Sequence, residues 1–89
     1  MGRAKAKQPK LIARKVKEVR LKLGFTQEQM ANALEKQGVK IHRGYVGLYE
    51  IGERMPPVLI ILAYAKVAGI STDQLIDDSL ELPAKYKTT

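Results

Sequence analysis

Positively charged side chains are concentrated in the first quarter of the chain, where they have the chemistry needed to bind a polyanion. The 89 residues include 16 Lys and Arg against 9 Asp and Glu, a formal net charge of +7. Residues 1–23 contain nine of the basic side chains and a single acidic one, Glu18. Each phosphate that such a segment neutralises releases condensed counterions, so the charge favours a nucleic acid as partner. The alternative from charge alone is a solubilising tail followed by a solvated helix face.

Side chains that catalyse reactions or bind metals are scarce in this sequence. There is no Cys and one His, which excludes disulfides, thiolate metal sites and Cys nucleophiles. His42 alone cannot build a zinc site, and no cluster of carboxylates accompanies it. Asp77 and Asp78 are expected to form a solvated helix end, and no Ser/His/Asp set or phosphate-binding loop is present. The sequence therefore predicts no enzyme activity, no cofactor and no metal.

The apolar segments are too short to cross a membrane. The longest apolar run, from Met55 to Ala65, has 11 residues and contains two prolines, whereas a membrane span needs roughly 20 residues. The basic N-terminal residues are not followed by the apolar region of a signal peptide. We therefore expect a cytoplasmic protein without a membrane partner, built on one modest core.

Apolar spacing and helix-ending signals predict two helices in the first half of the chain. The face of the first helix repeats at steps of three and four residues through Ile12, Val16, Val19 and Leu23. Pro9 suits the first turn of this helix, and Gly24 is expected to end it. Thr26 and Gln29 have the spacing of a capping box, which starts a second helix over about residues 26–37.

Three more short helices are expected in the second half of the chain. They cover about residues 42–51, 57–68 and 71–77. A second capping box, formed by Ser71 and Gln74, begins the last of them. With no strand pattern anywhere, the predicted fold is all-α with five helices.

These helices divide the chain into a domain and two flanking segments. The domain is expected to cover residues 10–77. Residues 1–9 have no periodicity and are expected to form a basic flexible arm. Residues 78–89 are expected to be a loose C-terminal tail, with three residues that could dock on the core: Leu80, Leu82 and Tyr86.

The ordered set of these features resembles the helix-turn-helix domain of the Cro/CI family, also called lambda-repressor-like or Xre. The resemblance covers about residues 10–77 and implies a five-helix fold whose third helix enters DNA. One departure is a lengthened turn, because residues 35–40 (EKQGVK) add about five residues between helices two and three. The matching positions are Arg20, residues 24–31 (GFTQEQMA), Arg43, Val46, residues 49–52 (YEIG), residues 54–56, residues 64–65, residues 69–71 and residues 75–76.

The resemblance implies that residues 42–51 form a recognition helix that reads base edges in the major groove. Arg43 is the best candidate for a base contact, because two N–H groups of its guanidinium can donate to guanine O6 and N7. The alternative for Arg43 is a phosphate contact. Leu48 can meet a thymine methyl or pack at the helix edge. Glycine allows close approach to DNA, and this recognition helix contains Gly44 and Gly47.

Contacts to the DNA backbone are expected around this helix. Gln27 resembles the family residue that bonds a phosphate at the start of helix two. Phosphate is also a candidate partner for His42, Lys40 and Arg54. Tyr45 is expected either to reach a phosphate or sugar or to close the inserted loop. Basic side chains of the N-terminal arm could reach around the duplex.

Arg20 and Glu50 resemble the internal ion pair of the family, which links helix one to helix three. Each lies at the margin of an apolar face, where a charge needs a partner. We therefore expect this pair to be structural rather than functional.

The fourth helix has more apolar surface than one core needs. Its inward face is expected to consist of Val58, Ile61, Leu62 and Ala65. A second apolar stripe, which predicts a homodimer interface, consists of Leu59, Ile60, Ala63 and Val67. The alternative is that the C-terminal tail covers this stripe.

The expected function is that of a sequence-specific DNA-binding transcriptional regulator that represses by occupying promoter DNA. The first alternative is an antitoxin or other protein-interaction module, with a toxin as partner and autoregulatory DNA binding. The second is a protein that binds RNA or any nucleic acid without sequence preference.

Overall fold

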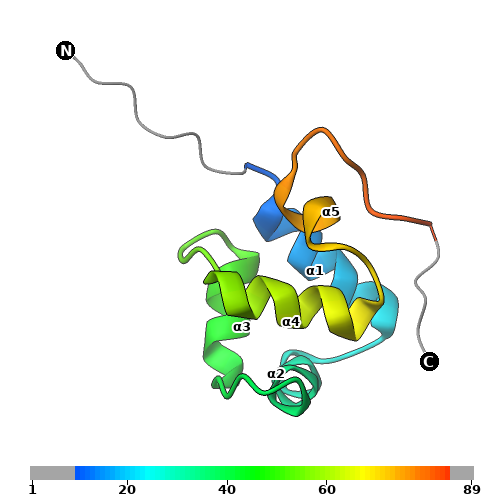
Figure 1. Ribbon diagram of the computed structural model, residues 1–89. Coiled ribbons are helices and arrows are strands. Elements are labelled where there is room, and N and C mark those ends of the chain that lie inside the picture. The colour runs from blue at the N-terminus through cyan, green and yellow to red at the C-terminus, as the bar shows by residue number, and fades with distance from the viewer. Residues whose placement is uncertain (1–9, 85–89) are drawn as a thin grey trace.

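Five helices make up the computed structural model, which describes residues 10–84 (Figure 1). α4 crosses the centre of the view, with α5 above it, α2 below it and α3 beside its left end, and α1 packs against α3, α4 and α5. No strand occurs within residues 10–84, and the all-α, five-helix fold expected from the sequence is confirmed. The helices are α1 (Ile12–Leu23), α2 (Gln27–Lys36), α3 (Arg43–Glu50), α4 (Val58–Ala68) and α5 (Thr72–Ile76).

Helix ends lie close to where the local signals placed them. Gly24 adopts a left-handed conformation with φ of 75° and ends α1, a geometry that favours glycine. At the start of α2, the Gln29 amide N–H donates to Thr26 Oγ1 over 3.1 Å, and Gln29 Oε1 accepts from the Thr26 amide over 2.8 Å. The same reciprocal capping box joins Ser71 and Gln74 at α5. α1 itself begins at Ile12, while Pro9 lies outside the described residues.

The turn between α2 and α3 is long, as the sequence predicts. Residues 37–42 connect the two helices, and Gly38 has a φ of 97°. Val39 and Ile41 are half-buried against the core, whereas Lys40 between them is exposed. Because side chains in extended backbone alternate between two faces, anchoring these two apolar residues turns the ammonium of Lys40 outward.

The buried face of α4 differs from the expected one, and two residues assigned to a dimer interface are in the core. Ile60 and Ala63 are only 6% and 2% exposed. Val58 and Leu62, expected to face inward, are exposed instead. The reason is that α4 packs against α1, α2 and α5, so several sides of it are covered. A helix that is apolar all round gives no periodic signal to show which sides these are.

A charged side chain, that of Lys15, lies fully buried on the apolar face of α1. Its Nζ donates to three backbone carbonyl oxygens: those of Gln74 at 2.7 Å, Asp77 at 2.9 Å and Leu80 at 2.8 Å. These carbonyls lie at the end of α5 and in the segment that follows it. Helix C-termini leave such carbonyls without intrahelical partners and favour a cation. Lys15 therefore joins the C-terminal segment to α1.

The described part of the C-terminal tail, residues 78–84, is attached to the domain rather than loose. Asp78 accepts hydrogen bonds from the backbone amides of Lys10, at 2.8 Å, and Leu11, at 3.2 Å. α1 has no capping side chain of its own, so Asp78 serves as its N-terminal cap from the far end of the sequence. Leu82 packs against the core as expected, whereas Tyr86 lies outside the described residues.

The Asp78 cap predicts a dependence of stability on pH. The backbone hydrogen bonds from Lys10 and Leu11 lower the pKa of Asp78 below its usual 3.8. A carboxylate whose pKa is lowered by folding stabilises the native state above its usual pKa, and this contribution disappears as the pH falls through the lowered value. Asp78→Asn should therefore reduce the melting temperature at pH 6, and the difference from wild type should shrink as the pH falls below about 4. Thermal unfolding followed by circular dichroism between pH 2 and 6 measures this, and an equal difference at every pH would contradict it.

Candidate nucleic-acid interface

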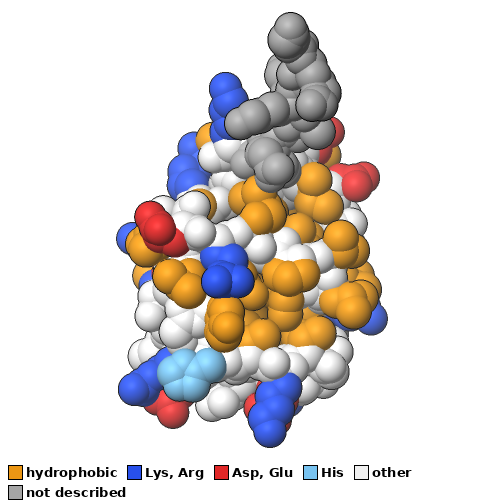
Figure 2. Space-filling model, turned by 90° about the vertical axis from the view of Figure 1, so that its left-hand side faces the viewer, with side chains coloured by type: hydrophobic (Ala, Val, Ile, Leu, Met, Phe, Trp, Pro, Cys, Tyr) orange, Lys and Arg blue, Asp and Glu red, His pale blue; other side chains and the backbone are white. Residues whose placement is uncertain are grey.

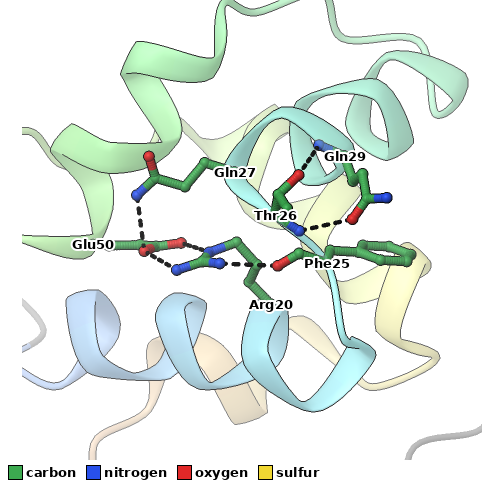
Figure 3. A network of polar contacts seen from close by, with 6 residues as sticks. All are labelled: Arg20, Phe25, Thr26, Gln27, Gln29 and Glu50. Atoms are coloured by element: carbon green, nitrogen blue, oxygen red, sulfur yellow. Dashed lines mark hydrogen bonds and ion pairs between the residues drawn. The ribbon is translucent and has the colours of Figure 1, made fainter.

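A network of polar side chains joins α1, α2 and α3 around Arg20 (Figure 3). Arg20 Nε donates to Glu50 Oε2 over 2.6 Å, and its Nη2 donates to Glu50 Oε1 over 3.0 Å. Its Nη1 donates to the carbonyl of Phe25, in the turn between α1 and α2, over 2.9 Å. The hydrogen bond to Glu50 raises the pKa of Arg20 above its usual value. The structure thus contains the ion pair between Arg20 and Glu50, in the two-pronged geometry that fixes both partners.

Gln27 extends this network from α2 to α3. Its Nε2 donates to Glu50 Oε1 over 3.3 Å, as Figure 3 shows. A Cβ on Gly47 would lie 3.4 Å from both polar atoms of the Gln27 amide. The Gln27 side chain therefore lies directly against α3 at Gly47, where a methyl group would make ordinary van der Waals contact with it. Since an amide nitrogen carries two hydrogens, Gln27 retains one N–H for a second partner.

His42 caps the start of α3. Its Nδ1 accepts a hydrogen bond from the Gly44 amide over 3.0 Å. A neutral imidazole that accepts at Nδ1 carries its proton on Nε2, so the exposed edge of the ring is a hydrogen-bond donor. A Cβ on Gly44 would lie 3.2 Å from Nδ1, so the glycine makes room for the cap. This residue occupies the N-cap position despite the poor general suitability of histidine there.

Arg43, the first residue of α3, is exposed and paired with a glutamate of α2. Its Nη1 lies 3.3 Å from Glu28 Oε1, and the side chains of the two residues are 62% and 66% exposed. Together with Arg20, Thr26 and Gln27, this pair lines an open depression on the surface. The depression lies at the N-terminus of α2, where a helix favours negative charge. Arg43 and the helix N-terminus favour an anionic ligand here, whereas the carboxylate of Glu28 opposes one.

Tyr45 and Arg54 lie together on the other side of α3. The Arg54 guanidinium carbon is 5.4 Å from the centre of the Tyr45 ring, within the range of a cation–π contact. The ring is also 6.4 Å from that of Tyr49, which is buried. This places Tyr45 beside the segment that follows α3 rather than against the lengthened turn before it.

The outward face of α3 has few side chains that form hydrogen bonds. Gly44 and Ile51 are exposed and Leu48 is half-buried, while the opposite face buries Val46 and Tyr49. Arg43 is therefore the principal polar side chain that this helix presents at its first turn.

Three residues with clear roles were not singled out from the sequence. Lys15 follows Ile12 by three positions and precedes Val19 by four, so its place on the buried face of α1 was visible in the spacing. Glu28 and Asp78 gave no comparable signal, because their partners are distant in the chain or in another helix. Only the tertiary arrangement reveals these two contacts.

Neither a metal-binding cluster nor a membrane-spanning helix occurs within residues 10–84. No group of three or more His, Asp or Glu side chains in this range could hold a metal ion. None of the helices in this range is long and apolar enough to cross a membrane.

The arrangement of α2, a connecting turn and α3, with the first turn of α3 open to solvent, defines a helix-turn-helix DNA-binding domain. Residues 16–75 match the family model HTH_3, described as helix-turn-helix, and the chain belongs to this Xre-type, lambda-repressor-like family. The family binds double-stranded DNA and is not enzymatic, so the protein is a DNA-binding transcription regulator of the Xre type. A search of curated proteins found no match to this chain.

Proposed function

We propose that this protein is a sequence-specific repressor that inserts α3 into the major groove of an operator. The position of Arg43 carries this proposal, because its side chain is exposed at the first turn of a helix held by the Arg20–Glu50 pair. The guanidinium fork matches guanine O6 and N7. Leu48 supplies an apolar contact for a thymine methyl at the next turn. Occupation of promoter DNA would then exclude the transcription machinery. A protein with this function acts in the cytoplasm, where we propose that its DNA lies.

Phosphate contacts on both sides of α3 would set the register of the helix in the groove. On the α2 side, Gln27 has a second N–H beyond its bond to Glu50, and His42 has its Nε2 edge exposed. Lys40 presents its ammonium from the lengthened turn. On the other side, Arg54 lies over the Tyr45 ring, where it can meet a phosphate while the ring meets a sugar. Such contacts position a protein on DNA without reading its sequence.

Base reading by Arg43 predicts different effects for two single substitutions. Arg43→Ala should relax the base preference at one position of each half-site, at a cost of about 1–3 kcal/mol on the preferred sequence. Lys40→Ala should weaken binding to all sequences alike and reduce the salt dependence. Selection from a random DNA pool at fixed salt identifies the site, and fluorescence anisotropy on that site and on scrambled DNA measures both effects. A wild-type protein that selects no sequence would overturn the proposal.

We further propose that two copies of the protein associate through an exposed apolar surface. Figure 2 shows hydrophobic side chains gathered on the side of the molecule where α3 and the α3–α4 connection lie. Among the large apolar residues of this part of the chain, exposure reaches 69% for Ile51 and 76% for Val58. The exposed large apolar residues between the end of α3 and the middle of α4, which we take as this apolar surface, are Ile51, Met55, Val58, Leu59 and Leu62.

This surface replaces the dimer stripe expected from the sequence, of which Leu59 remains exposed and Val67 is half-buried. A dimer bound to a palindrome would hold its two α3 helices about 34 Å apart, one turn of DNA. Sedimentation equilibrium of the full chain tests this association. A monomeric mass at high concentration would contradict it and would favour the antitoxin alternative, in which the same apolar surface binds a different protein.

A further inference from the structure

Glu28 lies close enough to Arg43 to restrain the orientation of its guanidinium. Glu28 is the second residue of α2, and its Oε1 accepts from Arg43 Nη1 across the gap between α2 and α3. Both side chains are more than half exposed, and exposed ion pairs of this kind contribute little to stability. The pair therefore has no evident structural purpose comparable to that of Arg20 and Glu50.

The Glu28 carboxylate accepts from only one nitrogen of the Arg43 guanidinium. Nη1 contacts Glu28, and no contact of Arg43 Nε or Nη2 is recorded within residues 10–84. A guanidinium has five N–H donors in a fixed plane, so four donors remain for a ligand while the carboxylate restrains the plane. When the orientation of the Arg43 guanidinium is already restrained, the side chain loses less conformational entropy on forming two hydrogen bonds to a base.

Glu28 also lies beside the groups expected to meet DNA phosphates. It lines one surface depression with Gln27 and Arg43, and an adjoining one with His42 and Arg43. A carboxylate at this place repels a phosphate that approaches Arg43. Its repulsion of a guanine edge is weaker, because O6 and N7 carry only partial negative charge.

We propose that Glu28 is a specificity-determining residue that positions Arg43 for guanine and disfavours its capture by phosphate. The inference rests on the proposed reading of a base by Arg43. It predicts that removal of the Glu28 charge acts in two directions. Binding to the preferred site weakens or stays unchanged, because Arg43 is less well positioned, while binding to scrambled DNA becomes stronger.

The test compares Glu28→Gln with Glu35→Gln in the full chain. Both substitutions remove one exposed negative charge from α2, but Glu35 is near the other end of the helix. Affinities are measured at fixed salt for the selected site, for the same site with the guanine read by Arg43 replaced, and for scrambled DNA. Glu28→Gln should reduce the preference for that guanine by about tenfold, whereas Glu35→Gln should change all three affinities by a common factor. Melting temperatures should be nearly the same for both variants.

A double substitution separates positioning from general charge. In an Arg43→Ala background, Glu28→Gln should no longer affect the preference at that position, because the residue it positions is gone. If Arg43→Ala relaxes the preference for that guanine but Glu28→Gln behaves like Glu35→Gln, the role proposed for Glu28 is refuted while the proposed function stands. If wild type prefers no sequence, the proposed function itself fails, and this inference fails with it.

Discussion

Replacing Lys15 with methionine should destabilise the protein by about 2–4 kcal/mol, since it removes a charged donor from three carbonyl oxygens. Methionine keeps most of the apolar part of the lysine side chain and its packing. The loss of stability therefore measures the removal of the ammonium group rather than the creation of a cavity. The Asp77 carbonyl keeps the hydrogen bond that it accepts from the Leu80 amide, whereas all three carbonyls lose the ammonium. For a domain of this size, a loss of this magnitude lowers the melting temperature by roughly 10–25 °C.

Lys17→Met is the matched control for this substitution. Lys17 lies on the same helix, two positions further along, and is exposed. Chemical denaturation and thermal unfolding of the two variants should show a large loss for Lys15→Met and a change within about 0.5 kcal/mol for Lys17→Met. Equal effects of the two substitutions would show that the buried ammonium does not hold the C-terminal segment.

Glu50→Ala should destabilise the protein by about 3 kcal/mol, the lower end of the range for removing one partner of a buried ion pair. The lower end applies because the Arg20 side chain keeps 13% exposure, whereas Glu50 keeps 3%. The substitution leaves two guanidinium nitrogens of Arg20 without their acceptor and also removes the acceptor of Gln27. Because this network joins α1, α2 and α3, DNA affinity should fall as well, even at temperatures where the variant is folded.

The control for Glu50 is Glu53→Ala, which removes an exposed carboxylate three residues later in the chain. Urea denaturation of the two variants gives the stability difference, and a double-mutant cycle with Arg20→Met isolates the coupling between the two charges. A melting curve of Glu50→Ala that coincides with that of wild type would refute the structural role of the pair.

The local part of the fold was open to prediction from the sequence. Capping boxes join residues three positions apart, and glycine at a left-handed position depends on its own backbone, so neither needs knowledge of the tertiary structure. Thr26 with Gln29, Ser71 with Gln74, and Gly24 illustrate this. For the same reason the number and order of the helices followed from the spacing of residues.

The structure differs from the sequence expectation in part of the buried face of α4 and in the attachment of residues 78–84, and both differences have a physical origin. α4 is apolar nearly all round, so its sequence is compatible with burial on any side, and only contacts with other helices select Ile60 and Ala63 for the core. Asp78 has no local feature that distinguishes it from a solvated carboxylate. Its role arises because the start of α1 lies next to the segment after α5.

The sequence by itself determined the five helices, the capping boxes of α2 and α5 and the placement of a basic residue at the first turn of α3, because these depend on residues within a few positions of one another. The tertiary structure alone decided that Lys15 and Asp78 join the two ends of the domain, that Glu28 accompanies Arg43, and which side of α4 remains apolar and exposed. These contacts join groups far apart in the chain or in different helices, and their energies depend on distances that only the packing of the helices sets.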